Sequence, residues 1–164
     1  MDFSSWKDVL ETLAKTGLLA LFVAMAGWFF VYKNSRSLQK RSETWAIVKN
    51  ISDLLKEIET CSRKFWLPSD DKFLNAMSYQ MEVSACISEV ERWMALFESR
   101  ISKKNMLSED CANVITQIFR EATFNIESVA TTDKMQRMRV VALLSKHSTR
   151  IKHYIDTGFT RQFF

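Results

Sequence analysis

An uncharged run at residues 16–32 constrains this chain more than any other feature of its sequence. The run reads TGLLALFVAMAGWFFVY and is bounded by Lys15 and Lys33. At 1.5 Å per residue, a helix of about 17 residues covers about 26 Å, at the short end of what crosses a hydrocarbon layer of about 30 Å. Leu13 and Ala14 can extend it, while the two lysines reach outward to the headgroups. The run therefore predicts one transmembrane helix.

Two other interpretations of this run are weaker. A buried core helix is usually shorter and keeps a polar stripe, whereas this run is apolar on all sides for about five turns. A cleaved signal peptide needs a positively charged start. Although Ala24-Met25-Ala26 resembles a cleavage site, the residues before the run carry three acids against two lysines. The sequence therefore favours a helix that stays in the chain.

The charges on either side of the run predict its orientation. Lys33, Arg36, Lys40 and Arg41 follow it before any acid. By the positive-inside rule, we expect the N-terminus outside and the C-terminal domain in the cytoplasm, at an inner or plasma membrane. Residues 1–15 place apolar side chains at helical spacing and are expected to form a short amphipathic segment.

Composition favours one all-α domain after the span. The chain has 3 Gly and 1 Pro in 164 residues, which argues against sheets and turn-rich folds. Its three cysteines, Cys61, Cys86 and Cys111, form no Cys-x-x-Cys pair and suit a reducing compartment. Residues 33–164 are therefore expected to form a cytoplasmic helical bundle domain.

Apolar periodicity divides this domain into about four helices, the first continuous with the span. Their expected starts are Ser35, Ser69-Asp70-Asp71, Ser108 and Thr131-Thr132-Asp133. Pro68 ends the first helix, Lys103 the second, and Gly158 is expected as the residue that follows the last. Short loops between such helices predict an antiparallel up-down-up-down bundle.

The side chains expected in the core recur at three- and four-residue steps, and the second helix follows an a/d pattern typical of coiled coils. They are Trp45, Val48, Ile51, Leu55 and Ile58; then Phe73, Ala76, Met77, Met81, Val83, Ile87, Val90, Met94, Phe97 and Ile101; then Cys111, Ile115, Ile118, Ala122 and Val129; and last Val140, Leu144, Ile151, Tyr154 and Ile155. Gln80 interrupts the second stripe, and as a buried polar group it could set the register.

Two groups of residues are candidates for interaction. The bundle's connectivity predicts a basic end near the membrane, where anionic lipids attract cations. Its residues are Lys33, Arg36, Lys40, Arg41, Lys103 and Lys104. Ala20, Ala24 and Gly27 lie on one side of the span, and small residues at that spacing let two helices approach closely. The span is therefore a candidate for self-association.

The sequence carries no motif of a known enzyme class. His147 and His153 are six residues apart on one expected helix, so they project in different directions and cannot share a metal. There is no P-loop, no G-x-G-x-x-G, no H-E-x-x-H and no G-x-S-x-G. Residues 131–164 carry an excess of Lys and Arg but lack interleaved aromatics, which argues against binding of nucleic acid. We expect no catalytic residue, no cofactor and no metal site.

Three functions are open on this evidence. The first is a membrane-anchored, non-enzymatic interaction or scaffold protein, with a cytoplasmic docking bundle. Its partners would be the lipid bilayer, an unidentified protein, or further copies of the chain in a homo-oligomer. The second is a membrane-acting effector, toxin-like or defensive, that oligomerises through its span, although the span lacks a polar stripe to line a pore. The third is a sensor with an extracytoplasmic bundle, where three free cysteines would be unusual.

Overall fold

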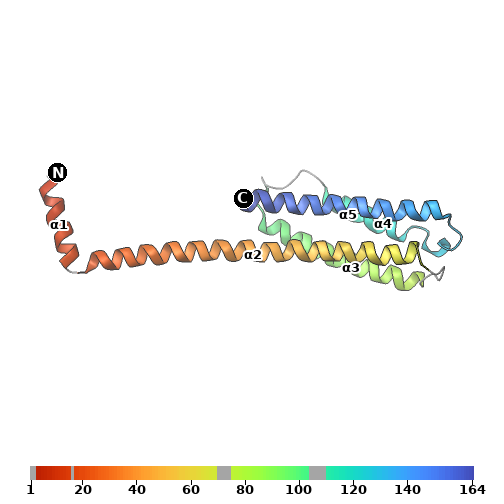
Figure 1. Ribbon diagram of the computed structural model, residues 1–164, viewed down its shortest axis with the longest axis horizontal. Coiled ribbons are helices and arrows are strands. Elements are labelled where there is room, and N and C mark those ends of the chain that lie inside the picture. The colour runs from red at the N-terminus through yellow and green to blue at the C-terminus, as the bar shows by residue number, and fades with distance from the viewer. Residues whose placement is uncertain (1–2, 16, 70–74, 104–109) are drawn as a thin grey trace. The chain divides into compact units, whose positions relative to one another are not determined.

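The computed structural model describes residues 3–15, 17–69, 75–103 and 110–164 (Figure 1). Over these ranges the chain forms five α-helices, a short 3-10 helix and no strand, which confirms the expected all-α composition. The helices are α1 (Phe3–Lys15), α2 (Leu18–Trp66), α3 (Ala76–Arg100), α4 (Cys111–Thr123) and α5 (Lys134–Phe163), with η2 (Ile126–Ser128) between α4 and α5.

The chain divides into two compact units, Met1–Ser42 and Glu43–Phe164. Helix α2 contributes its first half to unit 1 and its second half to unit 2. The expected continuous helix through residues 35–64 is therefore confirmed. Pro68 follows shortly after the end of α2, where its missing N–H and fixed φ prevent a further turn.

The predicted transmembrane helix at residues 16–32 is wrong. In the part of the chain that the structure describes, no helix has both the length and the apolar content needed to cross a membrane. The same finding contradicts the predicted single-pass membrane location, in which the N-terminus lies outside and a cytoplasmic domain follows the span. The fold is a helical bundle preceded by helical residues, without the transmembrane element.

The physical reason lies at Gly17, which has a positive φ of 71°. This left-handed conformation ends α1 and separates it from α2, so Leu13 and Ala14 belong to a different helix and cannot lengthen the apolar run. What remains is the apolar stretch, defined here as residues 18–32, before Lys33. A helix of about 15 residues covers only about 22 Å, well below the 30 Å of a hydrocarbon layer.

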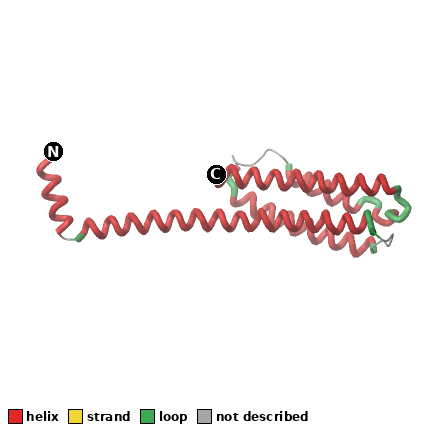
Figure 2. The backbone as a smooth tube through the Cα atoms, in the orientation of Figure 1, coloured by secondary structure: helices red, strands yellow, loops and turns green. Residues whose placement is uncertain are grey.

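Unit 2 is the expected antiparallel bundle. The second half of α2 and the helices α3, α4 and α5 lie alongside one another, and consecutive helices run in opposite directions (Figures 1 and 2). Contacts across the bundle join α2 to α3 through the Glu43–Arg100 ion pair, at 2.7 Å, and α2 to α5 through the Glu59–Lys152 pair, at 3.0 Å. The up-down-up-down arrangement of four helices is therefore confirmed.

Most of the predicted core is buried. Its confirmed members are Val48, Ile51, Leu55, Ile58, Val83, Ile87, Val90, Met94, Phe97, Ile101, Cys111, Ile115, Ile118, Ala122, Val129, Leu144, Ile151, Tyr154 and Ile155. Ala76 and Val140 are partly buried against this core. Trp45 is 52% exposed, although one face of its ring meets Phe159, with the ring centroids 5.2 Å apart. Phe73 lies outside the described residues.

The predicted stripe of α3 is wrong in its first turns. Met77, Gln80 and Met81 are exposed, and Tyr79 is the buried residue instead. The Tyr79 ring stacks on Phe65 of α2, with centroids 4.0 Å apart, and its hydroxyl shares a hydrogen bond with Ser62 at 2.9 Å. Gln80 is thus not the buried polar group that was expected to set the register.

Two helix ends also differ from prediction. Helix α3 begins at Ala76, because the side chain of Asn75 accepts hydrogen bonds from the N–H groups of Met77 and Ser78. Asp110 caps α4 in the same way. Ser69, the predicted cap of α3, lies in a turn before the helix, while the predicted first-turn acids Asp70 and Asp71 and the predicted cap Ser108 lie outside the described residues. Lys103 does not end α3, whose last residue is Arg100.

The last helix starts as predicted but does not stop at Gly158. Asp133 caps α5, and its carboxylate accepts from the N–H of Met135. The helix then continues through Gly158 to Phe163. A Cβ at Gly158 would lie 3.3 Å from Cζ of Phe97, so this glycine permits close packing of α5 on α3 rather than ending a helix.

Candidate interaction surface

The apolar stretch of α2 is the one long apolar segment whose described side chains are all exposed. Its ten large apolar side chains are between 44% and 71% exposed. They are Leu18, Leu21, Phe22, Val23, Met25, Trp28, Phe29, Phe30, Val31 and Tyr32. Within unit 1, the described residues therefore supply no cover for this surface.

The stretch is apolar on every side of the helix because its sequence contains no polar residue at any helical phase before Tyr32. An amphipathic helix would turn one face inward and one toward water. A helix without a polar face gains from being covered on several sides. A fully buried aromatic side chain accounts for about 150–250 Å² of surface, so the stretch leaves on the order of 1,000 Å² of apolar area in water. Typical monomers expose patches of only about 300–600 Å².

Aromatic rings are concentrated toward the end of the stretch. Trp28 stacks on Tyr32 with ring centroids 5.6 Å apart, and Phe29 meets Phe30 edge to face at 6.5 Å. These contacts lie along one helix, and each of the four rings remains more than half exposed. Large, rigid rings of this kind dominate the binding energy at protein interfaces.

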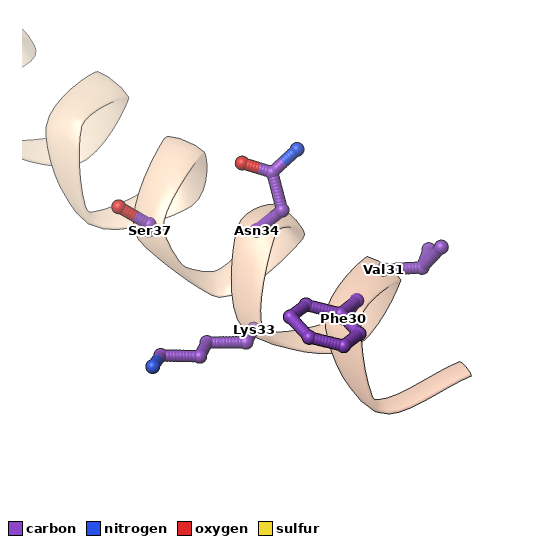
Figure 3. A pocket seen from close by; sticks show the side chains of 5 residues that line it. All are labelled: Phe30, Val31, Lys33, Asn34 and Ser37. Atoms are coloured by element: carbon purple, nitrogen blue, oxygen red, sulfur yellow. The ribbon is translucent and has the colours of Figure 1, made fainter. Parts of the chain in front are cut away.

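Shallow grooves follow these rings where the stretch meets the basic residues. One is lined by Phe30, Val31, Lys33, Asn34 and Ser37 (Figure 3). All five side chains come from two turns of a single helix, and those of Lys33 and Asn34 point to opposite sides of it in this view. The groove is therefore an open surface between side chains of one helix, without a second wall that could enclose a small molecule.

A second groove shares Lys33 and Ser37 with the first and is also lined by Phe29, Tyr32, Arg36 and Lys40. It joins the apolar stretch to the basic segment, defined here as residues 33–41. Lys33, Arg36 and Lys40 are exposed and Arg41 is half-buried. Their expected contact with anionic lipid stays a prediction. Lys103 is exposed in unit 2, and Lys104 lies outside the described residues.

The three small residues of the predicted self-association face lie within the apolar stretch, and Ala20, Ala24 and Gly27 are all exposed. A Cβ added at Gly27 would meet nothing within 4 Å. A glycine inside a helix costs about 1 kcal/mol relative to alanine. Packing among the described residues of unit 1 therefore does not explain the glycine at this position.

The bundle offers little chemistry in comparison. Burial, with the charges of Glu82 and Cys86 nearby, raises the pKa of the Cys61 thiol to about 11. Burial also raises the pKa of Cys86, and all three cysteines are buried without forming a disulfide. A thiolate is the reactive form of cysteine, so burial keeps Cys61 and Cys86 in the less reactive thiol form at neutral pH. All three cysteines belong to the buried core of the bundle.

His147, one of the two histidines of α5, lies partly buried in the bundle. Burial lowers the pKa of His147, and the neighbouring Arg150 adds to that effect. In the described ranges, no three His, Cys, Asp or Glu side chains gather closely enough to hold a metal ion.

The sequence identified the apolar stretch, but the transmembrane helix predicted there is wrong. The break at Gly17 shortens the helix that carries Trp28, Phe29 and Phe30, and a lone glycine between two helical patterns was the sequence signal for that break. No family model, no curated protein and no solved structure matches this chain.

Proposed function

We propose that this chain is a non-enzymatic interaction protein that docks other helices on the apolar stretch of α2. The observation that carries the proposal is the exposure of ten large apolar side chains on one uninterrupted helical segment. The helices of unit 2 bury a common core, so the bundle does not need a partner protein to cover its apolar side chains. The apolar stretch has no equivalent cover in the described part of the chain.

The kind of partner follows from the shape of the surface. A single straight helix presents a ridge, and its natural counterpart is another helix that packs side chains between its own. Trp28 and the phenylalanines at 29 and 30 supply the large anchors that such an interface uses. The open grooves around Lys33 lack the enclosing walls of a small-molecule site.

Photocrosslinking in cells that express the chain tests this proposal. A benzophenone side chain is placed at Phe22 or Phe29, with the equally exposed Phe124 of unit 2 as the matched control. We expect protein adducts of defined mass from the two sites in the stretch, and none from Phe124. Phe30→Asp in the same chain should abolish them, because a charge in a desolvated interface costs several kcal/mol.

Two outcomes would overturn the proposal. The first is the absence of any adduct from Phe22 and Phe29 while the chain is folded by circular dichroism. The second is the recovery of adducts with lipid alone, because the stretch would then lie against acyl chains rather than a protein helix. Equal adduct yields from Phe124 would show that the crosslinking reports only exposure.

A further inference from the structure

The structure points to a second copy of this chain as the helix that docks on the apolar stretch, and we infer that the two stretches pack antiparallel. This inference rests on the proposed function, because it names the partner for the same surface. Three observations carry it: the area that the stretch exposes, the charge that follows it, and the arrangement of its small residues.

The exposed area suits association with a like segment. The stretch leaves on the order of 1,000 Å² of apolar surface uncovered, and one neighbouring helix covers about half of it. Two copies then bury about 1,000 Å² in total, which reaches the lower limit for a specific interface. A second copy of the chain carries an identical stretch, which is apolar along the same length of about 22 Å.

The charge of the basic segment selects the orientation. Helices in contact have axes about 8–10 Å apart, so a parallel pair would set Lys33 beside Lys33 and Arg36 beside Arg36 of the other copy. Like charges about 10 Å apart repel by about 0.4 kcal/mol per pair in water. In an antiparallel pair, the basic segments lie at opposite ends of a stretch of about 22 Å, beyond the screening length of about 10 Å at 0.1 M salt.

The small residues fix the register of the antiparallel pair. When two helices cross near Ala24, Ala20 of one copy falls opposite Gly27 of the other, and the reverse holds by symmetry. The small sides then face each other, which brings the backbones close. The empty space around Gly27 within unit 1 is consistent with this use.

Cysteine pairing tests orientation and register together. Disulfides form only when Cα atoms lie within about 7 Å. Under mild oxidation of the purified full chain, Ala24→Cys should give a covalent dimer of twice 19.2 kDa. Ala20→Cys alone and Gly27→Cys alone should give at least about tenfold less, whereas a mixture of the two, one carrying a mass tag, should give the mixed dimer. The unmodified chain and Asp53→Cys, exposed in unit 2, are the controls.

Each alternative result has a distinct meaning. Self-crosslinking of Ala20→Cys and Gly27→Cys without the mixed product would show a parallel pair and overturn the inference. A sedimentation mass of one chain at all concentrations, with no crosslink above the Asp53→Cys control, would also overturn it. If photocrosslinking from Phe22 still gave an adduct with a different protein, the proposed function would survive while the second copy as partner would not.

Discussion

Helix α2 exposes its apolar side chains in one half and buries them in the other. In residues 18–32, Phe22, Trp28 and Phe30 are 62%, 69% and 71% exposed. In the second half, Ile51, Leu55 and Ile58 are fully buried under α3 and α5. The same backbone conformation runs through both halves, so helix formation alone does not determine which side chains are covered.

The difference shows which part of the chain completes its own folding. In unit 2, apolar faces from four helices meet, and rings such as Phe65 and Tyr79 stack inside a common core. In unit 1, the apolar stretch gains no such burial from the described residues. The bundle therefore accounts for stability within the chain, and the stretch is the part to which we assign association in our proposal.

The largest test of this comparison replaces one phenylalanine in each half. Phe65→Ala should lower the free energy of unfolding by about 3–5 kcal/mol, because a fully buried ring stacked on Tyr79 is lost and leaves a cavity. Phe30→Ala, which removes a ring that is 71% exposed, should change it by less than about 0.5 kcal/mol. Urea unfolding followed by circular dichroism measures both. Equal losses would contradict the division between a closed bundle and an open stretch.

The pH dependence of stability sharpens the comparison, because every cysteine lies in unit 2. The folded pKa of Cys61, at about 11, is above its ordinary value of 9.0. The unfolded chain therefore loses this proton first. The contribution of the protonated Cys61 thiol to stability is complete below pH 9. As the pH rises toward 11, this contribution is lost, and the free energy of unfolding falls by roughly 2–3 kcal/mol.

Urea unfolding at a series of pH values, with wild type and Cys61→Ala compared, isolates this contribution. The difference between the two chains should be constant below pH 9 and should shrink above it. Burial also raises the pKa of Tyr79 to about 12, so wild type and variant share a further alkaline loss that the comparison cancels. A difference that is flat from pH 8 to pH 11 would show that Cys61 is not buried as described.

The two helical glycines provide the next test. Gly158→Leu should destabilise the bundle by about 2 kcal/mol, because even a Cβ there lies 3.3 Å from Phe97 and overpacking costs about 1–3 kcal/mol. Gly27→Leu meets nothing within unit 1 and should leave the unfolding of the bundle unchanged, while it reduces the covalent dimer yield of Ala24→Cys. Thermal melts and the crosslinking assay measure the two effects. A lowered melting temperature for Gly27→Leu would place that glycine in intrachain packing instead.

The smallest expected effect comes from two lysine–carboxylate pairs. Lys152→Met should cost about 1 kcal/mol, because the Lys152–Glu59 pair at 3.0 Å joins α5 to α2 and is only about a third exposed. Lys15→Met removes the Lys15–Glu11 pair of α1, which is mostly exposed at 75% and 66%, and should leave bundle stability unchanged. Urea midpoints resolve the difference. Matching values for the two variants would mean that the cross-bundle pair adds nothing beyond a surface pair.

The sequence was most informative where apolar residues repeat over many turns. Leu144, Ile151 and Ile155 of α5 were placed correctly because seven- and four-residue steps leave only one helical phase for the core. The first turns of α3 were harder. Gln80 and Tyr79 are adjacent and differ by about 100° in phase, and only the stacking on Phe65 decides which one turns inward.

Other features were hidden because they depend on contacts that lie far apart in sequence. Gly158 has the sequence context of a helix end, yet its role is set by Phe97, which lies about 60 residues earlier. Hydropathy identified the apolar stretch but not its length, because the break at Gly17 is a backbone conformation rather than a change in composition. The sequence therefore identified the apolar stretch, whereas the transmembrane helix predicted from it is wrong.

The positive φ of Gly17 also separates the helical phases of α1 and α2. Along a continuous helix, one inserted residue rotates every later side chain by about 100° relative to those before it. No such rotation is transmitted across a left-handed residue, because the helix restarts on its far side. Residues 3–15 can therefore gain or lose residues without turning the faces of α2. Length changes before Gly17 are therefore neutral to the register of residues 18–32, whereas a single insertion within residues 18–32 would rotate one part of the apolar stretch against the other by about 100°.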